Sequence, residues 1–124
     1  MTPRNTLILG MMLMALGIGL GAFGAHALKE TLELSGRKET FELGIRYLLY
    51  HALGFILLGR LMESYSKLRI AVLFLTVGIA VFSGSLVTLA LTNQSLWGAV
   101  APLGGSTLIA GWLLAAWVVY TQEK

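Results

Sequence analysis

The sequence contains no cysteine and few charged residues. Without cysteine there are no disulfides, no thiolate chemistry and no cysteine-ligated zinc or iron–sulfur site. Charged residues make up 12% of the 124 positions and hydrophobic residues 56%, with a mean hydropathy of +0.79. A soluble domain of this size would carry charges along the exposed faces of its helices. Here the charges gather at the ends of apolar segments, so we expect lipid to be the solvent for much of the surface.

The basic residues do not form a nucleic-acid-binding stripe. The net charge is +3 and the isoelectric point is near 9.5. Lysine and arginine instead flank the apolar segments on both sides. We therefore expect the lipid bilayer, and no nucleic acid, as a partner.

Four apolar segments organise the chain, at residues 6–28, 41–61, 68–91 and 96–120. Each is long enough to cross about 30 Å of hydrocarbon as a helix. None shows the period-two alternation of membrane β-strands. The connections are short, so consecutive segments must be antiparallel neighbours. The sequence predicts a single membrane domain over residues 1–124, an all-α integral membrane four-helix bundle with up-down-up-down topology.

The end of the first segment and the connection after it allow two further predictions. Ala25-His26-Ala27 has the form of a signal-peptide cleavage site, but the apolar run before it is longer than a signal core, so we expect it to stay in place as a span. Residues 29–40 are expected to form a short amphipathic turn on the membrane surface, ended by Gly36.

The distribution of lysine and arginine favours both termini in the cytoplasm. The opposite side has three basic residues, or four if Arg46 reaches that surface. The side with the termini has five: Arg4, Arg60, Lys67, Arg69 and Lys124.

The second segment holds a candidate polar cluster of Glu42, Arg46, Tyr47 and His51, with His26 at the end of the first segment. Residues 47–61 alone would span only about 22 Å, which places Arg46 inside the membrane boundary, where it can snorkel or pair with Glu42. His51 lies about 15 Å along the helix from Phe41, near mid-bilayer, and should face the bundle interior, where Tyr47 at i−4 could hydrogen-bond it.

Three roles remain open for the two histidines. They can be packing residues with satisfied hydrogen bonds, part of a proton or ion path, or a bis-imidazole haem or metal site. Two histidines without a spaced third ligand are weak evidence for a metal, so we expect neither a metal nor another cofactor. No acidic residue lies within the first, third or fourth segment to orient either histidine, and we expect no catalytic residues.

Small residues are expected to set the helix packing. Gly17, Gly21 and Gly24 fall on one face of the first helix, where they allow close approach of a neighbour. The opposite face is also small, so this helix is expected to lie between two neighbours, one of them a second copy of the chain. Further packing residues are expected in the last two segments: Ser83, Gly84, Ser85, Pro102, Gly104 and Gly105.

Four ordered motifs together resemble the domain-of-unknown-function family 423, also called uncharacterised protein family 0382. They are Gly21-Ala22-Phe23-Gly24-Ala25-His26, Tyr47 with His51-Ala52-Leu53, Phe82-Ser83-Gly84-Ser85-Leu86 and Pro102-Leu103-Gly104-Gly105. The resemblance covers nearly the whole chain. It implies four membrane helices, an uncleaved first segment and location in the bacterial cytoplasmic membrane, and it brings no activity. Many relatives have tyrosine where this chain has Val87.

These observations favour a non-enzymatic structural or interaction protein of the cytoplasmic membrane, forming a homo-oligomer. The alternatives are a conduit for protons, ions or small solutes that uses the His/Arg cluster, and a bis-His haem or metal protein. The sequence identifies no small ligand.

Overall fold

The structure is a computed structural model that describes residues 1–122, and this part of the chain is all-α. The helices are α1 (Pro3–Ala25), α2 (Lys29–Ser35), α3 (Lys38–Leu61), α4 (Leu68–Thr92) and α5 (Leu96–Thr121). All but the seven-residue α2 are long and apolar enough to cross a membrane. The predicted fold class, a four-helix membrane bundle, is confirmed.

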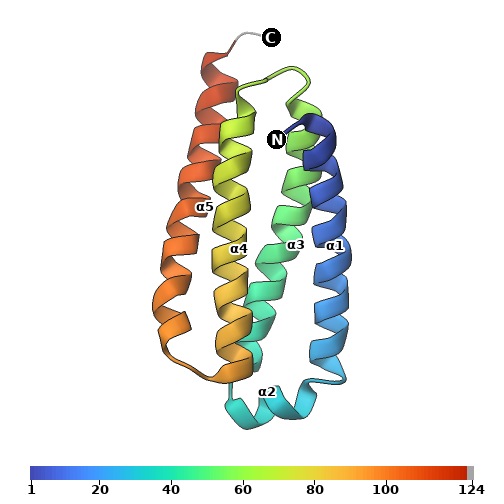
Figure 1. The fold of residues 1–124 in the computed structure, drawn as a ribbon, viewed down its shortest axis with the longest axis vertical. Helices are drawn as coiled ribbons and strands as arrows, with labels where there is room; N and C mark the ends of the chain where they lie inside the picture. The colour runs from blue at the N-terminus through green and yellow to red at the C-terminus, as the bar shows by residue number, and fades with distance from the viewer. Residues whose placement is uncertain (123–124) are drawn as a thin grey trace.

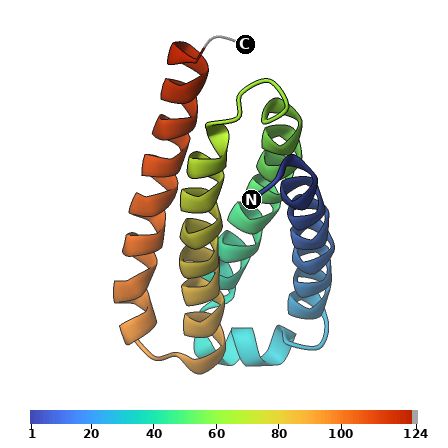
Figure 2. The ribbon, with the colours of Figure 1, turned by 45° about the horizontal axis from the view of Figure 1, so that its top comes forward.

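The four long helices run alternately up and down (Figures 1 and 2). Helix α1 packs on α3, α3 on α4, and α4 on α5. In both views α1 and α5 lie at opposite sides of the molecule. The start of α1 and the end of α5 share one end of the bundle, and α2 lies across the other end (Figure 1).

Local capping shifts the first helix three residues toward the N-terminus relative to the predicted 6–28. Thr2 is the N-cap, because its hydroxyl accepts a hydrogen bond of 3.1 Å from the backbone N–H of Asn5. Pro3 then opens the helix, where a missing N–H costs nothing. The helix ends at Ala25 with His26 as C-cap, and the remaining apolar residues turn the chain toward α2.

Helix α2 closes one end of the bundle. It ends, as predicted, at Gly36, which has a left-handed φ of 68° that favours glycine. Leu32 is its buried residue and packs in a cluster with Phe41, Ile45 and Ala90. One leucine therefore docks α2 on α3 and α4.

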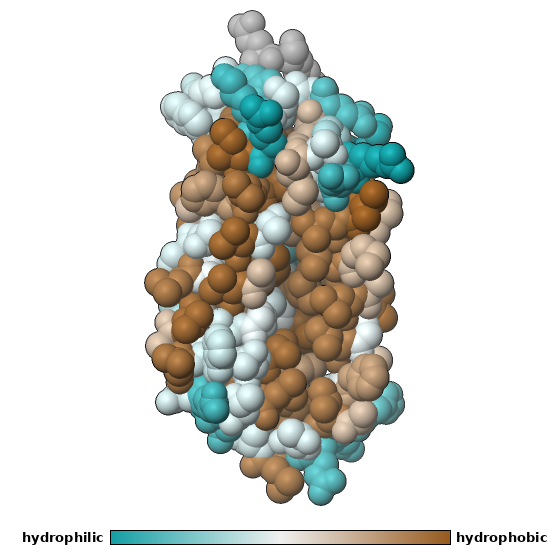
Figure 3. Space-filling model, in the orientation of Figure 1, coloured by the Kyte–Doolittle hydropathy of each residue, from teal (hydrophilic) through white to brown (hydrophobic). Residues whose placement is uncertain are grey.

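The surface is divided into an apolar band and two polar ends (Figure 3). The band carries exposed large apolar side chains of all four long helices, such as Met12, Leu53, Leu73 and Leu113. In water such a surface would be unfavourable, whereas in a bilayer it meets the acyl chains.

Glycines bring α1 against α3. A Cβ at Gly10 would lie 2.7 Å from Ile56, and one at Gly17 would lie 2.6 Å from Leu49. Gly24 abuts the ring of Phe41 in the same way. Gly21 has more room, because its Cβ would lie 3.7 Å from Ile45.

Glycines also allow close packing of α4 against α5. Gly104 lies against the backbone of Phe82, and a Cβ at Gly78 would lie 2.8 Å from Leu108. Gly105 has ordinary contact with the Phe82 ring, whereas Gly84 is exposed with nothing near its Cβ position. Pro102 is exposed within a continuous α5.

Candidate functional site

His51 occupies the middle of α3 and is 6% exposed. Its Nδ1 lies 2.7 Å from the backbone carbonyl oxygen of Tyr47, one turn earlier in the same helix. Its Nε2 lies 3.0 Å from Nε1 of Trp112, on α5. Both ring nitrogens therefore have a partner within the protein.

The partners fix the protonation of the ring. A carbonyl oxygen only accepts, so Nδ1 must carry the proton that it donates to Tyr47. An indole N–H only donates, so Nε2 must be unprotonated to accept from Trp112. His51 is thus a neutral imidazole with the proton on Nδ1, and its hydrogen-bonding capacity is used up.

Aromatic rings surround this pair of hydrogen bonds. The ring of Tyr47 lies 5.0 Å from that of Phe82 and 6.5 Å from that of His51. The rings of His51 and Trp112 are 5.9 Å apart. These side chains line a groove of about 530 Å³ between α3 and α5, over Phe82 of α4. The histidine therefore faces an apolar, aromatic surface.

A second polar contact ties α4 to α3 nearby. The hydroxyl of buried Ser83 donates to the carbonyl oxygen of Gly44 at 2.7 Å. Gly44 allows this approach, because a Cβ there would meet Leu86 at 3.2 Å. Ser85 is also buried. The polar groups of His51 and Ser83 both bond to neighbouring helices.

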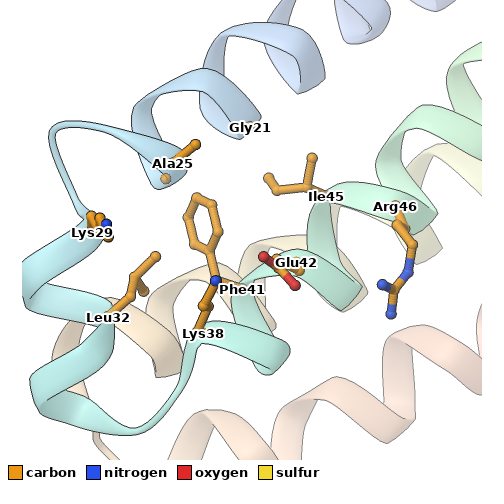
Figure 4. Close-up of a pocket in the computed structure, with 10 residues that line it drawn as sticks. Gly21, Ala25, Lys29, Leu32, Lys38, Phe41, Glu42, Ile45 and Arg46 are labelled. Carbon is orange, nitrogen blue, oxygen red and sulfur yellow. The ribbon is translucent and has the colours of Figure 1, made fainter.

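Glu42 and Arg46 lie elsewhere, in a pocket of about 470 Å³ at the α2 end of the bundle (Figure 4). Lys29 of α2 and Lys38 at the start of α3 line the same pocket. Of the two options predicted for Arg46, the pair with Glu42 does not form, since the one ion pair among residues 1–122 joins Arg60 and Glu63. Both side chains are exposed, which suits snorkelling toward the membrane surface.

The predicted cluster is thus divided into three places. His26 lies far from His51. Gly24, two residues before His26, abuts Phe41. Phe41 in turn lies ten residues, or about 15 Å, along α3 from His51. His26 itself is exposed at the end of α1. Tyr47 and His51 lie together in one groove, and Glu42 and Arg46 in another pocket. Within residues 1–122 no three His, Asp or Glu side chains are grouped closely enough to hold a metal ion.

Sequence reasoning missed Trp112, Lys29 and Lys38. Trp112 is an exposed tryptophan well inside α5, away from the helix ends where interfacial aromatics are expected. This position away from the helix ends was the sequence feature that could have indicated a role for the indole N–H. The two lysines are brought to Glu42 and Arg46 by α2, whose docking on the bundle no local pattern specifies.

Four apolar helices with charged ends and polar ties between them define a small multi-span membrane protein. Comparison with known proteins gives its family. A family model described as a protein of unknown function, DUF423, matches residues 20–105. The chain belongs to this family, as its four motifs predicted.

Curated relatives carry the family's other designation, UPF0382. The UPF0382 membrane protein of Staphylococcus haemolyticus is 39% identical over 109 residues, covering 87% of this chain and 88% of its own. That of Bacillus subtilis is 37% identical over 111 residues, covering 87% and 89%. The UPF0382 inner membrane protein of Escherichia coli K12 is 37% identical over 122 residues, covering 92% and 88%. No solved structure shows a significant match.

Proposed function

We propose that this membrane protein is a non-enzymatic structural or interaction protein whose polar residues within the membrane stabilise the bundle. The observation that carries the proposal is the bonding of His51, both of whose ring nitrogens are engaged by Tyr47 and Trp112. A proton carrier needs a nitrogen that can exchange protons, and a haem or metal ligand needs a free lone pair. The contacts of His51 favour neither.

The proposed location is the bacterial cytoplasmic membrane, with both termini in the cytoplasm. The name of the Escherichia coli relative, an inner membrane protein, supports the location. The lysine and arginine bias supports the orientation: Arg4, Arg60, Lys67 and Arg69 lie at the end of the molecule where α1 starts. Lys124, the fifth basic residue on this side, lies outside the described residues.

The proposed partner is a second copy of the chain, bound through the outer face of α1. This helix is the least buried of the four spans. Ala15 and Ala22 are exposed, and nothing lies within 4 Å of a Cβ placed at Gly19. Small side chains offer lipid little contact but allow a second helix to approach closely.

Flux measurements in proteoliposomes test the structural role against the conduit. We expect wild-type protein to show no proton or ion flux above that of empty liposomes between about pH 5 and 8. Flux that is present in wild-type protein and lost in His51→Leu would overturn the proposal. An oxidised-minus-reduced spectrum of gently purified protein tests the haem alternative, which a Soret band would support.

A further inference from the structure

The pocket at the α2 end combines positive charge with an apolar floor. Ten residues of α1, α2 and α3 line its 470 Å³. Three are cations, Lys29, Lys38 and Arg46, and one is a carboxylate, Glu42, which leaves a net charge of +2. The other six are apolar or glycine: Gly21, Gly24, Ala25, Leu32, Phe41 and Ile45.

The cations of this pocket are free to bind an anion. No ion pair within residues 1–122 involves any of the three, and no side-chain hydrogen bond given by the structure does so. Figure 4 shows Lys29 at one end of the pocket and Arg46 at the other, with Phe41, Glu42 and Ile45 between them. The positive charge is therefore spread along a groove rather than neutralised by Glu42.

The position of the pocket identifies the class of anion. Lys29 and Lys38 are the first residues of α2 and α3, at the polar end of the molecule where the apolar band stops. Phospholipid headgroups lie at this level, and basic pockets between membrane helices bind anionic headgroups. A free phosphate would gain nothing from the apolar lining, whereas a lipid can lay its glycerol and upper acyl chain along Gly21 and Ala25.

We infer that this pocket binds an anionic glycerophospholipid, with the phosphate at Lys29 and Lys38 and the glycerol and upper acyl chains along Gly21 and Ala25. Gly21 leaves space for those chains, because the nearest atom to its Cβ position lies 3.7 Å away on Ile45, whereas the ring of Phe41 fills the space beside Gly24. With the termini in the cytoplasm, the lipid belongs to the leaflet on the other side of the membrane. This site is independent of the structural role proposed for His51.

Native mass spectrometry of detergent-solubilised protein with added phosphatidylglycerol or phosphatidylcholine tests the site. We expect wild-type protein to retain phosphatidylglycerol preferentially. Lys29→Gln/Lys38→Gln should weaken that retention about 25-fold, since each basic residue near the surface contributes about fivefold. The matched control Lys67→Gln/Arg69→Gln removes the same charge at the opposite end and should bind like wild-type protein. Equal loss in both double variants, or no preference over phosphatidylcholine, would overturn the inference.

Two further measurements distinguish a lipid phosphate from free phosphate and control for misfolding of the variants. Millimolar inorganic phosphate should not displace the lipid, and displacement would mean a site for free phosphate instead. Glu42→Gln removes the opposing charge and should raise phosphatidylglycerol retention. A fall in phosphatidylglycerol retention would contradict binding through the positive charge of the pocket. Because this variant is expected to bind more tightly, a folding defect cannot imitate the result.

Discussion

At the scale of single residues, the protein uses its polar groups within the membrane to join helices. A hydrogen bond between side chains in a bilayer contributes about 0.6 kcal/mol on average, and up to about 1.7 kcal/mol. The bond from Trp112 to His51 is such a link, between α5 and α3. Losing either partner leaves the other polar group without its bond in an apolar groove. The effects of substituting Trp112 and His51 on the free energy of unfolding should therefore be coupled.

A double-mutant cycle with Trp112→Phe and His51→Leu measures this coupling. We expect an interaction free energy of about 1 kcal/mol in reversible unfolding in mixed micelles. Trp117→Phe is the matched control, because Trp117 is exposed on the same helix and its ring contacts Tyr120. It should combine additively with His51→Leu. Additivity in both cycles would contradict a stabilising Trp112–His51 bond.

At the scale of helices, close approach depends on where each glycine faces. The positions of Gly104 and Gly84 differ most clearly: one lies against the backbone of Phe82 and the other faces open space. Backbone cannot yield as a flexible side chain does. A methyl group at Gly104 must therefore separate α4 from α5, while one at Gly84 displaces nothing.

Gly104→Ala is expected to destabilise the protein by about 1–3 kcal/mol through overpacking. Gly84→Ala should be neutral or stabilising, because alanine favours a helix by up to about 1 kcal/mol over glycine. Unfolding in mixed micelles measures both, and equal effects of the two variants would refute the packing model for α4 and α5.

The spans could be predicted from the sequence, but contacts between distant helices could not. A membrane helix is a local run of apolar residues, and the left-handed turn at Gly36 needs a residue without a side chain. Trp112, the partner of His51, is 61 positions away in the sequence. Its place beside His51 depends on the axial register of α5 against α4. That register is set by many glycine and side-chain contacts at once. For the same reason the predicted cluster was assembled from residues that the fold keeps apart, such as His26 and His51.

At the scale of the whole molecule, the orientation of the bundle in the membrane and the pairing of α1 with a second copy can be tested separately. The chain has no cysteine, so single cysteines can be introduced without removing any. Ser64→Cys lies in the α3–α4 connection, at the end proposed to be cytoplasmic. Gln94→Cys lies in the α4–α5 connection at the other end.

Labelling with a membrane-impermeant maleimide measures the orientation of the protein in the membrane. In intact spheroplasts we expect Gln94→Cys to react and Ser64→Cys to be protected until the membrane is opened. The reverse pattern would place the termini outside.

Disulfide cross-linking in the membrane tests the second copy. Gly19→Cys, on the outer face of α1, should form covalent dimers on mild oxidation. Leu113→Cys, which is 67% exposed on α5 at the other side of the molecule, is the control and should not. Equal cross-linking at both positions would indicate random collision rather than an interface.

The protonation of His51 tests the account most directly. Nitrogen-15 NMR of histidine-labelled protein in bilayers distinguishes a protonated from an unprotonated ring nitrogen, and His26→Asn assigns the remaining signals to His51. The hydrogen bonds to Tyr47 and Trp112 predict a neutral ring at neutral pH with the proton on Nδ1 and none on Nε2. A proton on Nε2, or a fully protonated imidazolium, would contradict a structural His51 and favour a proton or ion path.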